Sequence, residues 1–182
     1  METKKDIRKR VLNIRDNICK TEWEAWSNKI YEKIVTHSFF MESECIYCYI
    51  NYKNEVDTKN IIERAWELGK LVAVPKIHGD EMCFHLIENF NELKEGYKGI
   101  LEPTTAILQD IKDGLIIMPG VAFDKNKNRI GYGKGFYDRF LDKYNYLSTL
   151  AIAFEMQVID EIPADEHDWK PQILITEEHT YV

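Results

Sequence analysis

The segment DGLIIMPGVAFDKNKNRIGYGKGFYDRFLDKYNYLSTLAIAF, residues 113–154, contains the pattern that decides the fold. Four apolar residues at 115–118 predict a buried strand that a Pro-Gly pair ends, and the apolar run at 147–154 predicts another. Between them, a polar turn at 124–128 leads into three alternating glycines and a helix from about residue 135 to 144. Short apolar strands separated by a helix are typical of a parallel sheet covered on both faces.

The same alternation of strands and helices extends through the rest of the chain. We predict a single domain over 1–182 with a three-layer α/β/α fold and a largely parallel central sheet. Pro75 is expected to end its strand, and Thr21 with Glu24 to form the capping box of the second helix. The other expected elements are helices through Ile7, Val11, Ile14 and Ile18, over 21–36 and over 57–69, and strands at 44–50, 71–75, 82–87 and 172–176.

Composition and charge exclude several classes of protein. The net charge of −7 on 182 residues argues against a general nucleic-acid binder, whose affinity depends on neutralising phosphates. No apolar run approaches the ~20 residues of a membrane span, and the N-terminus lacks the apolar core of a secretory signal. Cys45 and Cys48 lie an odd number of residues apart on an expected strand, so they face opposite sides and are interpreted as buried thiols. We expect a cytoplasmic monomer with no membrane or nucleic-acid partner.

The three glycines, Gly131, Gly133 and Gly135, stand among basic residues just before a helix. Glycine lets backbone amides approach a ligand closely, and inward-facing amides bind anions. The spacing fits neither a Walker A loop nor a dinucleotide fingerprint. Arg129 and Lys134, with the helix N-terminus, favour a phosphate site, and Asp138 in the first helical turn can hold magnesium. The alternatives are a flexible turn before a helix and, for Asp138, a capping charge alone.

The segment MPGVAFDKNKNRIGYGKGFYDRFL (118–141) resembles the signature of the 5-formyltetrahydrofolate cyclo-ligase family. Four further segments are similar to other parts of that family, and all five occur in the same order. They are KKDIRKRVLNIRD (4–16), YINYKNEVDT (49–58), GILEP (99–103) and HDWKPQILITEE (167–178).

The resemblance implies conversion of 5-formyltetrahydrofolate and ATP into 5,10-methenyltetrahydrofolate, ADP and phosphate, with Mg²⁺. It implies that Lys134 and Arg129 stabilise the transferred phosphoryl group and that Asp138 and Asp168 hold magnesium, while His167 receives no role. The implied ATP contacts are Lys4, Arg8, Arg129, Ile130, Gly131, Tyr132, Gly133, Lys134, Gly135, Phe136 and Tyr137. The implied folate contacts are Ile50, Glu55, Tyr132, Gly133, Lys134, Gly135 and Phe136.

Three positions depart from the family pattern, and three other functions remain open. Gln172 stands where many relatives have aspartate, Phe136 where tyrosine is common, and Tyr132 where some relatives have a basic residue. One alternative is a catalytically idle folate- or nucleotide-binding module of the same fold. The others are an RNA-associated protein using the basic N-terminal helix and a different ATP-dependent kinase or ligase.

Overall fold

A seven-stranded sheet forms the centre of the protein, in the order β12–β11–β9–β6–β1–β2–β3. The computed structural model describes residues 2–96, 99–163, 165 and 168–182. The five inner strands are parallel, whereas β3 and β12 pair antiparallel at the two edges. The strands are β1 (Cys45–Cys48), β2 (Leu71–His78), β3 (Glu81–Leu86), β6 (Leu115–Met118), β9 (Ser148–Ile152), β11 (Ile173–Ile175) and β12 (Thr180–Tyr181).

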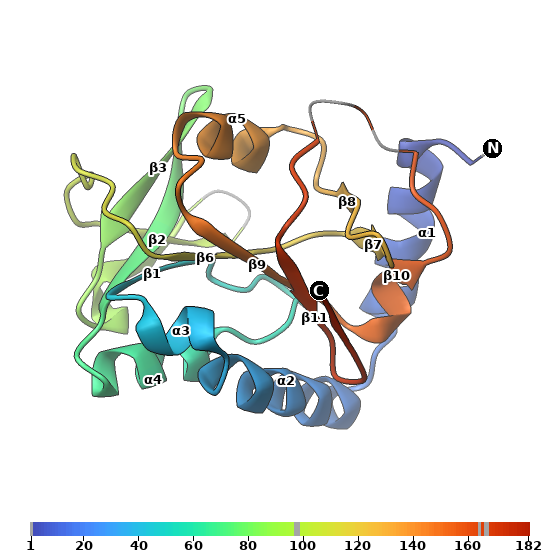
Figure 1. Ribbon diagram of the computed structural model, residues 1–182, viewed down its shortest axis with the longest axis horizontal. Coiled ribbons are helices and arrows are strands. Elements are labelled where there is room, and N and C mark those ends of the chain that lie inside the picture. The colour runs from blue at the N-terminus through green and yellow to red at the C-terminus, as the bar shows by residue number, and fades with distance from the viewer. Residues whose placement is uncertain (1, 97–98, 164, 166–167) are drawn as a thin grey trace.

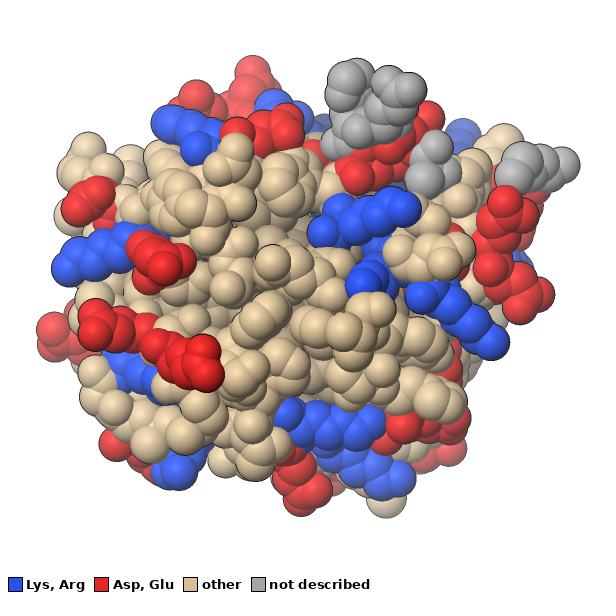
Figure 2. Space-filling view, viewed as in Figure 1, with Lys and Arg blue, Asp and Glu red and all other residues tan. Residues whose placement is uncertain are grey.

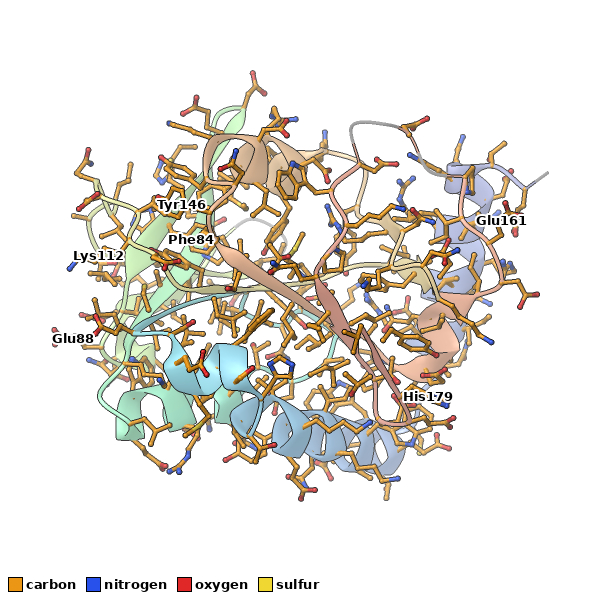
Figure 3. The ribbon with its side chains drawn as sticks, viewed as in Figure 1. Phe84, Glu88, Lys112, Tyr146, Glu161 and His179 are labelled. Carbon is orange, nitrogen blue, oxygen red and sulfur yellow. The ribbon has the colours of Figure 1, made fainter. Side chains whose placement is uncertain are left out.

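Helices cover both faces of this sheet, as Figure 1 shows. One face packs against α2 (Lys20–Val35), α3 (Ser38–Glu42) and α4 (Lys59–Glu67), and the other against α5 (Phe136–Lys143). Phe84 of β3 lies on the α5 side (Figure 3), where its ring contacts Phe140. The expected α/β fold with a largely parallel central sheet is therefore confirmed.

A second, smaller sheet of order β10–β7–β8 packs beside α1 (Lys4–Asp16). Ile7 and Val11 of α1 are buried against Ala122 and Ile130 of this sheet. None of the helices in the described part of the chain is long and apolar enough to cross a membrane. The remaining elements are β7 (Ala122–Asp124), β8 (Arg129–Ile130), β10 (Val158–Ile159), β4 (Leu93–Glu95), β5 (Leu101–Pro103) and the 3₁₀ turns η1 (Phe90–Glu92) and η3 (Glu155–Gln157).

Side chains of β1 alternate between the two sides of the sheet, as a strand requires. Ile46 and Cys48 belong to the apolar cluster on the α2–α4 side, and Cys45 and Tyr47 belong to the cluster on the α5 side. The two cysteines are free and buried, so the prediction of buried thiols is confirmed.

The strand order reverses between β1 and β6, which are parallel neighbours. From β1 the chain runs through α4 to β2 on one side, whereas β6 leads to β9 and β11 on the other. In open α/β sheets, ligands bind beyond the carboxyl ends of the strands at such a reversal. The segment after β1 contains Glu55 and the segment after β6 contains the glycine loop, so both start from this edge.

Three local predictions were wrong. The first helix, α1, ends at Asp16 and does not reach Ile18, and Ile14 is 39% exposed. The strand β2 continues past Pro75 to His78, because β1 pairs only with residues 71–73 and leaves that side of β2 free to accommodate a proline. The helix α2 begins earlier than Thr21: the backbone N–H of Cys19 donates to the Glu22 carboxylate at 3.4 Å, so the cap is Cys19.

Gly114, just before β6, lies against the backbone of Cys45 at the start of β1 and leaves no room for a side chain. A Cβ atom at Gly114 lies 2.3 Å from the backbone carbonyl oxygen of Cys45, which cannot move without disturbing the sheet. We expect Gly114→Ala to lower the free energy of unfolding by about 1–3 kcal/mol, as overpacking does. Urea denaturation measures the loss. Gly96→Ala is the control, because the three atoms nearest to a Cβ there all belong to the end of the flexible Glu102 side chain. Equal losses in both variants contradict the explanation.

The environment of His85 is expected to make the free energy of unfolding depend on pH. Its Nδ1 lies 2.7 Å from the Thr105 carbonyl oxygen and its Nε2 lies 2.9 Å from Nε2 of His78, so neutral His85 donates to the former and accepts from the latter. Burial lowers the pKa of His85, and His78 and Lys76 lower it further. Because the folded-state pKa lies below the ordinary 6.5, the unfolded chain binds more protons as the pH falls through that value, and stability decreases. Between pH 7.5 and 5.5, urea denaturation is expected to show a larger loss in wild type than in His85→Gln; parallel losses contradict this.

Candidate functional site

The glycine loop connects β8 to α5 through two backbone conformations that favour glycine. Gly133 has φ of +90° and Gly135, the residue that caps α5, has φ of +64°. Tyr132 and Lys134, which alternate with these glycines, are exposed. The spacing therefore turns the chain sharply into the helix while leaving two side chains at the surface of the loop.

A cavity of about 380 Å³ lies between this loop and the N-terminal helix. Residues from α1, β8, the loop, the first turn of α5 and the C-terminal segment surround it. On the face shown in Figure 2, Lys and Arg lie beside Asp and Glu in the part of the molecule between α5 and α1. All eleven residues of the predicted ATP set line the cavity, with both predicted magnesium ligands. The lining is Lys4, Arg8, Pro119, Arg129, Ile130, Gly131, Tyr132, Gly133, Lys134, Gly135, Phe136, Tyr137, Asp138 and Asp168.

Side chains of this set differ in how they face the cavity. Ile130 is 1% exposed because it packs against α1, so only its backbone is available there. Arg8 donates from Nε to the Gly131 carbonyl oxygen at 2.8 Å, which fastens the loop to α1. The guanidinium carbon of Arg139 lies 5.3 Å from the centre of the Phe136 ring. Phe136 therefore still makes a stacking contact, although it lacks the hydroxyl of the tyrosine that is common at this position.

Arg129 and Asp138 form a buried ion pair at the base of the cavity. The Nη2 of Arg129 donates to Oδ1 of Asp138 at 2.8 Å, and the side chain of Arg129 is only 5% exposed. The same carboxylate oxygen accepts from the backbone N–H of Trp169 at 3.2 Å. Arg129 also donates to the Pro119 carbonyl oxygen at 3.4 Å, so it connects the ends of β6 and β8 with α5.

Asp168, the second predicted magnesium ligand, pairs with Lys4. The ammonium of Lys4 lies 2.5 Å from Asp168 and from Asp165. Burial raises the pKa of Asp168, but the Asp165 amide and the Lys4 ammonium outweigh burial and leave the pKa below its ordinary value. Asp168 is therefore ionised at neutral pH, as a magnesium ligand must be.

Lys134 differs from the other cations of the cavity. Among the described residues its ammonium has no hydrogen-bond or ion-pair partner, whereas Lys4 and Arg129 are each paired with a carboxylate. Its backbone carbonyl accepts from Nη1 of Arg139 at 2.9 Å. The loop is thus anchored through its backbone while the Lys134 side chain stays available to an anion.

Glu55 lies behind the loop and is 7% exposed. One carboxylate oxygen accepts from the backbone N–H of Tyr52 at 2.8 Å, and the other accepts from the hydroxyl of Tyr132. Burial raises the pKa of Glu55 although these hydrogen bonds oppose the increase. Neither Glu55 nor Ile50 lines the cavity: Tyr132 covers the carboxylate, and Ile50 packs against the apolar cluster on the α2–α4 side.

Two residues near the site were missed in the sequence. Arg15 is 4% exposed and its Nη2 donates to the Tyr132 hydroxyl at 3.1 Å. It could have been found, because positions 4, 8, 11 and 15 follow one face of a helix. Arg139, which holds the Lys134 carbonyl, also donates to the Asp80 carbonyl oxygen at 3.1 Å, and no spacing signal indicates a contact so distant in sequence.

Two positions of the C-terminal segment remain. The side-chain oxygen of Gln172 accepts from the backbone N–H of Thr149 at 2.8 Å, so this departure from the family supports the junction of β9 and β11. His167 lies outside the described residues.

Comparison with known proteins agrees with the geometry. The family model described as "5-formyltetrahydrofolate cyclo-ligase family" matches residues 1–177. The Caenorhabditis elegans protein named probable 5-formyltetrahydrofolate cyclo-ligase is 28% identical, over 100% of this chain and 96% of its own. The solved 5,10-methenyltetrahydrofolate synthetase of Aquifex aeolicus is 30% identical, with a TM-score of 0.83 over 97% of this chain and 91% of that one. The solved synthetase of Mycoplasma pneumoniae is 25% identical, with a TM-score of 0.77 over 96% and 98%. The chain therefore belongs to the 5-formyltetrahydrofolate cyclo-ligase family.

Proposed function

We propose that this protein converts 5-formyltetrahydrofolate and ATP into 5,10-methenyltetrahydrofolate, ADP and phosphate. The observation that carries the proposal is the contact between Tyr132 and Glu55. The contact supports the proposal because the glycine loop, to which we assign the phosphates, lies within one side chain of the buried Glu55 carboxylate, to which we assign the pterin. A reaction that joins the γ-phosphate of ATP to a group on the pterin ring requires this proximity.

The chemistry needs positioning more than a protein nucleophile. The formyl oxygen attacks the γ-phosphorus as the bond to ADP breaks, which converts a poor leaving group into phosphate. The N10 nitrogen of the same folate then attacks the formyl carbon, the carbon–oxygen bond breaks with loss of phosphate, and N10 loses its proton as the ring closes. Because the nucleophile and the electrophile belong to one molecule, their orientation can contribute roughly 7–11 kcal/mol.

The cations of the cavity divide this work according to their contacts. The Lys134 ammonium lines the cavity and has no partner in the described part of the chain, so we assign to it the developing charge on the transferred phosphoryl group. Arg8 and Lys4, from one face of α1, bind the other phosphates. Arg129, which is buried and paired with Asp138, stabilises phosphoryl charge from the base of the cavity while it holds α5 in place.

Asp138 and Asp168 fit a magnesium ion by donor chemistry, since both are carboxylates that line the phosphate cavity. Each uses one oxygen in the hydrogen bonds described above, and among the described residues the other oxygen accepts none. Magnesium, when bound, supplies charge neutralisation to the phosphates. Glu55 takes paired hydrogen bonds from the amino-pyrimidine side of the pterin, and Ile50 supports the ring through packing.

Lys134→Ala is expected to lower kcat by about 10²–10³-fold, as the loss of one charge-stabilising donor does. Growth of the methenyl-folate absorbance, with 5-formyltetrahydrofolate, ATP and magnesium, measures the rate. Lys125→Ala is the matched control, because Lys125 is an exposed lysine in the turn before β8 and does not line the cavity. A wild-type trace that stays flat while the protein binds folate indicates the catalytically idle module instead.

Asp168→Asn is expected to raise several-fold the magnesium concentration that gives half-maximal rate, because one anionic oxygen ligand is lost. Titration of the rate with magnesium at fixed ATP measures this. The control is Asp165→Asn, which also removes a carboxylate from Lys4 but lies outside the cavity. If both variants shift the magnesium dependence equally, the effect comes from Lys4 and the metal assignment is wrong.

A further inference from the structure

Arg15 is a buried cation without a carboxylate partner. Arg15 lies at the end of the basic face of α1 and is only 4% exposed. No described carboxylate forms an ion pair with it. Nη2 donates to the Tyr132 hydroxyl at 3.1 Å, while Nε is buried with no hydrogen-bond partner among the described residues. An incompletely satisfied buried guanidinium is costly, and the nearby charge of Glu55 offsets part of this cost without a direct contact, so Arg15 can still gain from an acceptor brought by a ligand.

Glu55 and Arg15 face the same oxygen atom from two sides. The Tyr132 hydroxyl accepts from Nη2 of Arg15 and donates to the carboxylate of Glu55. The protein therefore presents a donor and an acceptor side by side, and one phenolic oxygen satisfies both.

Tyr132 is bound at its tip but not along its ring. The residue is 49% exposed although its hydroxyl points inward, and it lies between Gly131 and Gly133 outside any helix or strand. The apolar ring thus gains little from its position, and the glycines give the backbone freedom to turn it outward. A ligand needs only to replace two hydrogen bonds to displace it.

The replacing group must offer an acceptor beside a donor. The lactam edge of a pterin has this pattern, because the C4 carbonyl oxygen accepts and the neighbouring N3–H donates. We propose that Tyr132 occupies the lactam subsite in the ligand-free protein, and that Arg15 binds the 4-oxo oxygen of the pterin once Tyr132 has turned out. This rests on the proposed function, in which Glu55 binds the donor side of the same ring.

Arg15 then determines specificity, which a paired set of ligands tests. In the 4-amino-4-deoxy analogue of 5-formyltetrahydrofolate, an amino group replaces the oxygen and presents a donor to Arg15, and N3 loses its hydrogen and presents an acceptor to Glu55. Calorimetric titration without ATP is expected to show wild type binding the 4-oxo ligand at least tenfold more tightly than the analogue, because the mismatch leaves a buried donor unsatisfied. In Arg15→Gln the ratio is expected to fall several-fold but not to one, because the mismatch between N3 of the analogue and Glu55 remains. An unchanged ratio in a folded Arg15→Gln protein overturns the assignment.

Tyr132→Phe tests the displacement without touching a buried charge. Removal of the hydroxyl frees Glu55 and Arg15 from their internal partner, so the 4-oxo ligand is expected to bind up to about tenfold more tightly. Tyr146→Phe is the matched control: Tyr146 is 51% exposed, and its hydroxyl donates to the Ile111 carbonyl oxygen at 2.5 Å on the α5 side of the sheet (Figure 3). Weaker or unchanged binding in Tyr132→Phe means that the hydroxyl is structural and overturns the proposal.

The same measurements separate this proposal from the proposed function. If wild type forms methenyl-folate but neither variant behaves as expected, the reaction assignment stands and the roles of Arg15 and Tyr132 are wrong. If wild type neither binds nor converts 5-formyltetrahydrofolate, both fail.

Discussion

The ion pair between Arg129 and Asp138 is the interaction on which the geometry of the site depends. It joins β8 to the first turn of α5, and its two residues also contact the end of β6 and the segment that leads to β11. The pair is buried at Arg129 and only partly exposed at Asp138. Removing one partner of such a pair leaves an uncompensated buried charge, which is far more costly than removing a surface ion pair. The glycine loop between these residues can therefore bend freely without losing its position on the sheet.

Most charged side chains of the site have partners within the protein, and the Lys134 ammonium is the exception among the described residues. Lys4 pairs with Asp168, Arg129 pairs with Asp138, and Tyr132 connects Arg15 with Glu55. Ligand binding to such a site is an exchange, in which each new contact replaces one already made, so the net gain is smaller than the number of contacts suggests. In return, each of these charges keeps at least one partner within the protein, which lowers the cost of burying it.

Features that depend on residues close together in the sequence could be predicted, whereas contacts between residues far apart in the sequence could not. The parallel sheet and the helix after the glycine loop follow from local periodicity, and the convergence of the N-terminal cations on that loop follows from the family resemblance. The prediction that Pro75 ends its strand was wrong because it could not take into account that the neighbouring strand β1 is too short to pair with β2 at Pro75. The contact of Tyr132 with Glu55 joins residues 77 positions apart, and no periodicity encodes it. The side-chain partners of Asp138 and Asp168 were missed for the same reason.

Tyr132, which contacts Glu55, and Lys134, which lines the cavity, lie two positions apart in the glycine loop. Only Gly133 separates them, and its φ of +90° places it in a region that few other residues adopt. A rotation that carries Tyr132 away from Glu55 must be absorbed at Gly131 and Gly133, so it also changes where the Lys134 ammonium lies. If folate turns Tyr132 outward, it moves the one cation of the cavity that has no partner among the described residues. Any change in phosphate affinity that results must appear equally as a change in folate affinity when ATP binds first, because coupling between two binding sites is reciprocal. Under this proposal the glycine spacing would serve both ligands, by giving the loop a hinge on each side of Tyr132.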